Sequence, residues 1–404
     1  MNLDSRYLTF LLCCIIPITL IDALNGFMLM QSSGGLPLSS IYKIFLFSIF
    51  LLPLLNNPYL FLMLSLGCIS ISYQIFSGYT LNIFEDVSVV IRTALVVIIS
   101  TFFINYKSLL RETHLKIIEI IFVISFFIIT INVISGLFGY GFTTYGSKPA
   151  AGSLGLGYKG YYFAGNELGV LLICLYPVVR LAFGFSNNLR NKLFINLIFI
   201  TVSVLIGTKT STIGIAILVL LDLYKYFASS FIKGFILIIV SAVSVITILP
   251  RFSDHFNSRI ESMSYLLNSR GSNYIILSGR DDFLTNAWNY ICEHYGFFDF
   301  LLGSGSSFSA SVFKSTEMDF FDLFTWNGIF WSVFIYIFCF YLFTKIKTLL
   351  ITNDHKFFVT VTFILLFFIS ILAGHVLTSA MLLPFLGLYY PYFYLKNKME
   401  QDNA

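Results

Sequence analysis

Three carboxylates lie close together in the stretch STEMDFFDLFTWNGIFW, at residues 315–331, where a polar segment meets a long apolar run. Asp319 and Asp322 are three positions apart, so a helix that begins there would show both on one face. Acids at a helix N-terminus suit the macrodipole, which is a purely structural explanation. One cap would meet that need, and a carboxylate that faces water can also hold a ligand hydroxyl or take its proton. We therefore take Glu317 and Asp319 as candidate catalytic residues and expect Asp322, the deepest, to cap the helix.

A second candidate lies in LSGRDDFLTNAWNYICEHYG, at residues 277–296. Its apolar residues follow helical spacing, and Ser278 with Asp281 fits a capping box. The pattern predicts an amphipathic helix on the membrane-water boundary that includes Trp288 and ends near Gly296. Arg280 in the first turn would make an anion site, because a guanidinium grips phosphate with two hydrogen bonds. The alternative is a solvated Arg280 paired with a neighbouring aspartate.

Other polar candidates are weaker when each is taken alone. Residues 138–165 are rich in Gly and Tyr, which suits either a ligand-binding loop or an aromatic belt at the membrane surface. Lys209, at the tip of a predicted hairpin, is either a cation facing a cavity or a lysine whose charge reaches back to water. The Gly/Ser stretch at 301–311 would cradle a phosphate or merely connect two helices. His375 is a loop histidine between two apolar runs.

The composition shows what must position these groups. The chain is 57% apolar and 11% charged, whereas a soluble domain carries roughly a quarter charged residues. Apolar runs of about 18 residues or more predict membrane-spanning helices. The six cysteines show no CxxC or Cys/His spacing, so we predict neither disulfides nor a metal site. The apolar run after Arg6 lacks a small-residue cleavage site, and we expect it to be a retained first span.

We predict an all-α polytopic membrane protein with about twelve spans. The expected spans are 7–23, 39–55, 58–77, 87–104, 117–137, 166–184, 192–206, 211–229, 234–250, 322–343, 357–373 and 376–395. Three regions follow: residues 1–250 with nine spans and the outer loop 138–165, a large outer loop at 251–321, and residues 322–404 with three spans and a short tail. Arg92 is the one basic residue well inside a predicted span. Lys43 is assigned to a short outer connection, whereas most other Lys and Arg residues fall on the opposite connections, which predicts that both termini are cytoplasmic.

The layout resembles the O-antigen polymerase (Wzy) and O-antigen ligase (WaaL) group of bacterial glycan-assembly enzymes. The resemblance covers most of the chain, through the order of its motifs, the number of spans and the large late outer loop. The motifs are KGYYFAGNELG with Pro177 beyond it, GTKTSTIG, SGRDDFLTNAW, LLGSG and STEMDFFDLFTWNGIFW. Ligases commonly carry a His-Asn pair before the span that follows the large loop, and here that region has no His, which favours the polymerase.

The resemblance implies a GT-C-like, metal-free glycosyltransferase in the bacterial inner membrane, without cofactors. It would join polyprenyl-diphosphate-linked oligosaccharide repeats, as donor and acceptor, at the outer face. Expected partners are membrane lipids, a chain-length regulator and a flippase, with no nucleic acid. Diphosphate binding is assigned to Arg280, Lys209 and Lys159. Sugar binding is assigned to a larger polar and aromatic set: Tyr161, Tyr162, Asn166, Glu167, Trp288, Asp322 and His375.

Two alternatives stay open. The first is an O-antigen ligase that transfers glycan to a lipid or protein acceptor. The second belongs to another class, a polysaccharide flippase or other transporter. Transporters usually carry charges buried in mid-span and broken helices near the membrane midplane. Here the polar groups gather in the predicted outer loops, which favours chemistry at the outer face.

Overall fold

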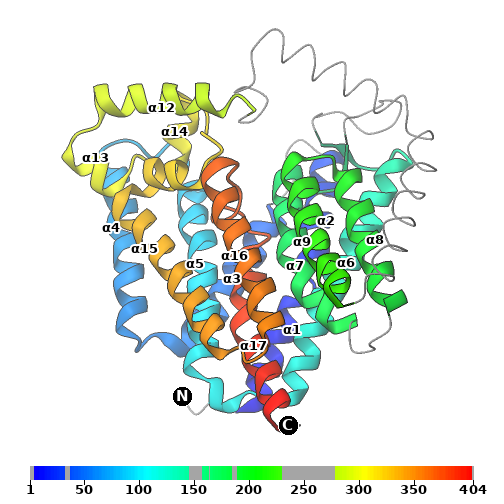
Figure 1. The fold of residues 1–404 in the computed structure, drawn as a ribbon. Helices are drawn as coiled ribbons and strands as arrows, with labels where there is room; N and C mark the ends of the chain where they lie inside the picture. The colour runs from blue at the N-terminus through cyan, green and yellow to red at the C-terminus, as the bar shows by residue number, and fades with distance from the viewer. Residues whose placement is uncertain are drawn as a thin grey trace.

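The computed structural model of the 404-residue chain describes residues 4–31, 37–144, 157–162, 164–183, 189–229 and 278–402. These residues form a bundle of helices (Figure 1). The longer helices are α1 Ser5–Ile15, α2 Ile18–Gln31, α3 Leu38–Leu51, α4 Pro58–Phe76, α5 Ile83–Asn105, α6 Glu112–Leu137, α7 Gly165–Phe183, α8 Leu189–Ile206, α9 Lys209–Ser229, α12 Arg280–His294, α15 Asp319–Leu349, α16 Asn353–Leu372 and α17 Leu383–Asp402. Shorter elements are the helices η1 Leu52–Leu54, η2 Lys107–Leu109, α13 Phe297–Leu302 and α14 Ser306–Val312, and an antiparallel pair, β1 Phe142–Thr143 and β2 Tyr158–Gly160.

The structure confirms a helical membrane protein. Seven segments among the described residues are long and apolar enough to cross a membrane: 5–31, 58–76, 83–105, 112–137, 165–183, 319–349 and 353–372. The helices α3, α8, α9 and α17 also overlap predicted spans, and the predicted span 234–250 lies outside the described residues. The total of twelve spans therefore stays a prediction.

Local chemistry explains where helix boundaries differ from the predicted ones. The first predicted span, 7–23, is divided into α1 and α2 by a break at Pro17, which has no backbone N–H to continue the helix. Helix α15 begins three residues before the predicted position, at Asp319. It is kinked at Gly328, whose φ angle is 78° and whose missing side chain lets the carbonyl of Leu301 approach. This approach fixes α13 against α15.

The predicted span 376–395 differs most. Helix α17 begins only at Leu383, and residues 373–382 form an irregular segment between α16 and α17. Most of this segment is buried. Irregular backbone inside a membrane protein needs internal partners for its polar groups, because lipid offers none. Those partners come from α15, as described below.

The core of the bundle is built around α5 and α17. Leu95 and Ile99 of α5 are fully buried, and Gly387 of α17 lies against Ile99. Helix α17 is buried around its whole circumference between Leu383 and Phe393, as expected for a helix enclosed by others. Trp331 ties α15 to this core, because its indole N–H donates a 3.1 Å hydrogen bond to the Thr93 hydroxyl of α5.

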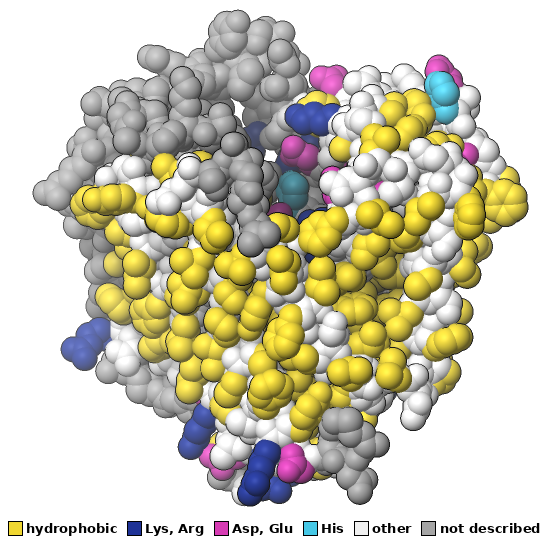
Figure 2. Space-filling model, turned by 180° about the vertical axis from the view of Figure 1, so that it is seen from behind, with side chains coloured by type: hydrophobic (Ala, Val, Ile, Leu, Met, Phe, Trp, Pro, Cys, Tyr) yellow, Lys and Arg dark blue, Asp and Glu magenta, His cyan; other side chains and the backbone are white. Residues whose placement is uncertain are grey.

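The two ends of the bundle differ in character. Both chain termini lie at one end, and α12, α13 and α14 lie at the other, with α12 running across the bundle (Figure 1). The face drawn in Figure 2 is largely apolar between these ends, and charged side chains gather towards them. This distribution suits a molecule that crosses a bilayer with its polar ends in water.

Two ion pairs inside the bundle correct the sequence analysis. Lys43 lies in α3 rather than in an outer connection, and its ammonium group contacts Asp22 of α2 at 2.6 Å. Arg180 of α7, near the end of the predicted span 166–184, pairs with the fully buried Asp222 of α9. Charges this deep need partners, and each pair supplies one.

Candidate functional site

Arg280 forms the centre of the site. It is the first residue of α12 and is 7% exposed, and its Nη2 donates to Oε2 of Glu317 at 3.0 Å. The predicted capping box is absent, because the N-cap is Gly279 in a left-handed conformation, without a side-chain cap. The Ser278 hydroxyl instead accepts a 3.0 Å hydrogen bond from the ammonium group of Lys209. Three parts of the sequence that are far apart, at residues 209, 278–280 and 317, therefore form one cluster.

Two of the three cations assigned to diphosphate binding, Lys209 and Arg280, lie near each other. Burial lowers the pKa of Lys209 at the start of α9, and the positive charge of Arg280 lowers it further. Like charges are held close only where something else stabilises them, and the Glu317 carboxylate supplies one negative charge. The cluster of Lys209, Arg280 and Glu317 keeps one excess positive charge, which suits an anionic ligand.

The backbone is strained at this cluster. Among the described residues, three non-glycine residues have positive φ angles: Ser278 at 58°, Glu317 at 56° and His375 at 64°. Ser278 contacts Lys209, and Glu317 contacts Arg280. The carbonyl of Glu317 lies so close to Gly374 that a side chain there would clash with it, which places His375 beside the same group. Such conformations cost roughly 1–3 kcal/mol each and gather at functional sites.

Asp319, a predicted catalytic residue, has a structural role here. Its side chain is fully buried, and its oxygens accept hydrogen bonds from the backbone N–H groups of residues 375, 376 and 377 and from the hydroxyl of Thr378, at 2.7–2.8 Å. These are the partners that the irregular segment before α17 requires. A carboxylate whose oxygens already accept four hydrogen bonds from the chain is poorly placed to take a proton from a ligand, because few of its lone pairs remain open.

Asp322 also differs from the prediction. The N-cap of α15 is Met318, and Asp322 lies inside the helix. Its oxygens accept from the Ser315 hydroxyl at 2.7 Å and from the backbone and hydroxyl of Thr316, both at 2.8 Å. Asp322 therefore holds the loop that presents Glu317, and it neither caps the helix nor leaves oxygens open to a sugar.

The candidate residues before α7 and in its first turn divide into two groups. Tyr162 is fully buried and its hydroxyl donates to the carbonyl of Thr19, so it has no ring face open to a sugar. Tyr161 packs edge-on against Phe27. Lys159 of β2 lies over the Phe142 ring at 5.7 Å, and burial lowers its pKa. Asn166 and Glu167 in the first turn of α7 are half-buried, and Glu167 accepts a 2.8 Å hydrogen bond from the Ser379 hydroxyl.

The Gly/Ser stretch at 301–311 holds no open phosphate cradle in its described conformation. Asp86 of α5 accepts from the hydroxyls of Ser306 and Ser307 and from the backbone N–H of Ser307, at 2.7–2.9 Å. A carboxylate of the chain thus occupies the place that an anion would take. Trp288 of α12 is 50% exposed and belongs to the outer surface of that helix. The stretch therefore connects α13 to α14 and forms most of α14.

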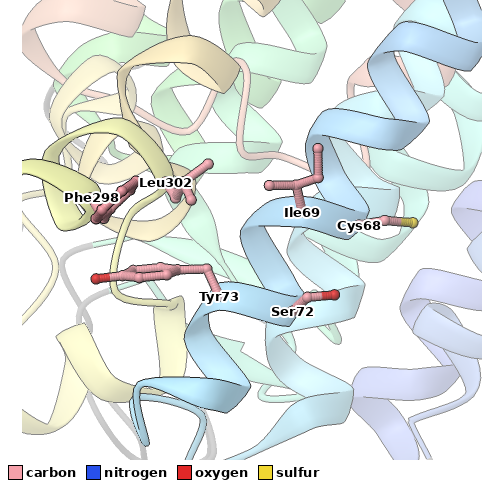
Figure 3. Close-up of a pocket in the computed structure, with 6 residues that line it drawn as sticks. All are labelled: Cys68, Ile69, Ser72, Tyr73, Phe298 and Leu302. Atoms are coloured by element: carbon pink, nitrogen blue, oxygen red, sulfur yellow. The ribbon is translucent and has the colours of Figure 1, made fainter.

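Figure 2 shows a hollow at the end of the bundle where α12 lies, with basic, acidic and histidine side chains inside it. A second concavity is different in kind (Figure 3). It has a volume of about 480 Å³ between α4 and α13 and is lined by Cys68, Ile69, Ser72, Tyr73, Phe298 and Leu302. No charged side chain lines it, so the chemistry belongs to the polar hollow. No group of three His, Cys, Asp or Glu side chains among the described residues could hold a metal ion.

Sequence reasoning missed the segment that joins these groups. Gly374 lies against Glu317, and Ser379 binds Glu167, so one short piece of chain contacts both sides of the site. His375 was its only member with a visible signal in the sequence. Comparison of the chain with protein families, with curated proteins and with solved structures found no match.

Proposed function

We propose that the protein is a metal-independent glycosyltransferase of the bacterial inner membrane, with a GT-C-like fold and cytoplasmic termini. It would polymerise polyprenyl-diphosphate-linked oligosaccharide repeats at the outer face. The observation that carries the proposal is the cluster of Lys209, Arg280 and Glu317 at the end of the bundle opposite the chain termini. A reaction that expels a diphosphate and removes a proton needs cations for the leaving group and a carboxylate for the proton, and this cluster contains both.

In the proposed reaction, an acceptor hydroxyl attacks the anomeric carbon of the donor sugar. A new glycosidic C–O bond forms while the bond from that carbon to the diphosphate oxygen breaks. The hydroxyl proton passes to the Glu317 carboxylate, and the lipid diphosphate leaves with the electron pair. Lys209 and Arg280 stabilise the charge that develops on it, an effect worth several kcal/mol in comparable sites.

Of the two acids that the sequence analysis took as catalytic candidates, Glu317 and Asp319, we choose Glu317 as the base. Asp319 carries four hydrogen bonds and is fully buried, whereas the Glu317 side chain is 32% exposed and has Arg280 as its partner. An arriving diphosphate would compete for Arg280 and release the carboxylate beside the reacting atoms. His375, which lies next to the same group, is the second choice.

The test is polymerisation by purified protein in detergent, with lipid-linked repeat as the only substrate. Arg280→Ala should abolish long chains, and Arg280→Lys should restore them only partly, because lysine lacks the two-pronged guanidinium. Lys347→Ala removes an exposed cation towards the C-terminal end of α15 and serves as a matched control. Long chains made by Arg280→Ala at wild-type rate would refute the proposal.

Transport is the second candidate, because the ion pairs of Lys43 with Asp22 and of Arg180 with Asp222 lie inside the bundle. Buried charge pairs of this kind mark substrate or proton paths in many transporters. The same assay separates the two functions, since a transporter has no product to make in detergent. Proteoliposomes that move lipid-linked repeat across the bilayer, together with a detergent assay without product, would favour transport.

A further inference from the structure

A groove with a volume of about 440 Å³ lies between helix α12 and the chain at the end of α14. Its helical side is formed by Phe283, Asn286, Asn289, Tyr290 and Glu293. These residues recur at three- and four-residue spacing, which places them on one face of α12. The volume lies within the range of about 300–1,000 Å³ that is usual for ligand sites. No residue of the reaction cluster lines this α12 groove, so the two are separate sites.

The floor of the α12 groove is aromatic. Phe313, just past the end of α14, is buried, and its ring centroid lies 5.4 Å from that of the half-buried Tyr290. His294 stacks on Tyr290 with 4.4 Å between the ring centroids. The ammonium group of Lys314 lies 4.1 Å from the centroid of the Phe283 ring. Contacts between α12 and the chain after α14 therefore hold the two sides of the groove together.

Polar side chains surround this floor. Asn286, Asn289 and Glu293 on the helix and Lys314 on the opposite side are all exposed. Each amide offers N–H donors and a carbonyl acceptor to a ligand. The negative charge of Glu293 offsets the positive charge of Lys314. The α12 groove is thus neutral as a whole, whereas the reaction cluster carries one excess positive charge.

A glycan chain matches this combination of groups. The apolar face of a sugar ring can pack against an aromatic ring while the sugar hydroxyls exchange hydrogen bonds with the amides. A diphosphate would meet no net positive charge in the groove. A lipid tail would take water away from the amides of Asn286 and Asn289 without giving them hydrogen bonds in return. The groove therefore favours a sugar over an anion or a hydrocarbon.

The α12 groove lies at a definite distance from the reaction cluster, because both use the same helix. A helix rises about 1.5 Å per residue, so Asn286 and Glu293 lie roughly 9 Å and 20 Å beyond Arg280 along α12. Helix α12 runs across the end of the bundle opposite the chain termini (Figure 1). A glycan that reacts beside Arg280 would therefore reach the groove with sugars further along its chain. Trp288, which the resemblance assigned to sugar binding, does not line the groove.

We propose that the α12 groove binds the glycan chain several sugars away from the bond that forms and retains it between successive additions. This inference rests on the proposed function for its role, since only a polymerase has a growing chain to retain. The binding itself involves neither the lipid nor the reaction and is measured separately. Weaker retention releases chains earlier and shortens the product.

The experiment uses full-length protein in detergent and two probes. Oligosaccharides of different lengths, released by mild acid from the surface polysaccharide of the cells that make the protein, are titrated by saturation-transfer NMR, and inorganic pyrophosphate by calorimetry. Asn286→Ala/Asn289→Ala removes two exposed amides and should weaken oligosaccharide binding about tenfold, as expected for the loss of about two hydrogen bonds. Pyrophosphate binding should stay unchanged. Gln401→Ala removes an exposed amide near the end of α17 and is the matched control.

Asn289→Trp fills the groove without emptying any packed position and should weaken oligosaccharide binding as well. Both groove variants should make shorter products than the wild type in the polymerisation assay. The proposal is overturned if no oligosaccharide binds the wild type, or if both variants are folded and bind as the wild type does. It is also overturned if the double alanine variant loses pyrophosphate binding instead, or if product length does not change when oligosaccharide binding weakens. Groove-dependent oligosaccharide binding by a protein that makes no polymer would uphold the glycan site and refute the polymerase.

Discussion

Replacement of Glu317 by Gln should separate anion binding from catalysis. The Arg280 and Glu317 side chains are 9% and 32% exposed, and the atoms of the pair are 3.0 Å apart. Because the carboxylate is about one-third exposed, water screens the pair, and we assign it about 1 kcal/mol, at the upper end of measured values for exposed pairs. Pyrophosphate must displace this carboxylate to reach Arg280. Glu317→Gln should therefore raise pyrophosphate affinity about fivefold, since 1.4 kcal/mol corresponds to tenfold.

The same variant should lower the turnover of lipid-linked repeat by roughly 100-fold or more, the usual contribution of a general base. Calorimetry and the detergent polymerisation assay measure the two effects on one preparation. Asp402→Asn, at an exposed acid at the end of α17, controls for the general change in charge. The double variant Arg280→Ala/Glu317→Gln should lose the gain in affinity. Unchanged or weaker pyrophosphate binding in Glu317→Gln would show that the carboxylate does not compete with the anion, and undiminished turnover would remove it as the base.

Three further predictions follow from the same contacts. Asp319→Asn should lower the free energy of unfolding by about 2 kcal/mol or more, because the amide would turn its own N–H donors towards backbone N–H groups that donate to the carboxylate in the wild type. Thermal melting in detergent measures this loss, with Asp282→Asn at an exposed position as the control. Because the pKa of Lys209 is lowered, its charge is lost at a lower pH than in a free lysine, so pyrophosphate binding should fall as pH rises into the alkaline range. Lys209→Arg should move that fall to higher pH. Identical pH profiles for the two proteins would mean that Lys209 does not contact the anion. Cys292, exposed on α12, should react with an impermeant maleimide added to the outer face of spheroplasts, and labelling only after permeabilisation would invert the orientation.

The helices could be predicted because each one corresponds to a long apolar run of consecutive residues, a signal that does not depend on distant parts of the chain. Most predicted spans overlap observed helices, and Arg280 indeed begins the amphipathic helix. The segment before α17 could not be predicted, because its residues are as apolar as a helix and only the distant carboxylate of Asp319 makes the irregular backbone tolerable. The partner of Arg280 was equally hidden, since Glu317 lies 37 positions away. The sequence analysis took Glu317 and Asp319 as catalytic candidates and Asp322 as a helix cap. The hydrogen bonds instead separate the three acids into one partly exposed residue, Glu317, and two structural residues.

The packing of α17 against α5 has a consequence for how the protein is made. A ribosome adds roughly 5–20 residues per second. The buried face of α5 is therefore synthesised tens of seconds before α17 exists to cover it. During that interval α5 must be shielded by lipid or by the insertion machinery, and the polar hollow cannot close, because Ser379 and the residues held by Asp319 come just before α17. Assembly of the bundle is thus a late event in biogenesis, and mutations in α17 should appear as failures of maturation rather than of membrane insertion.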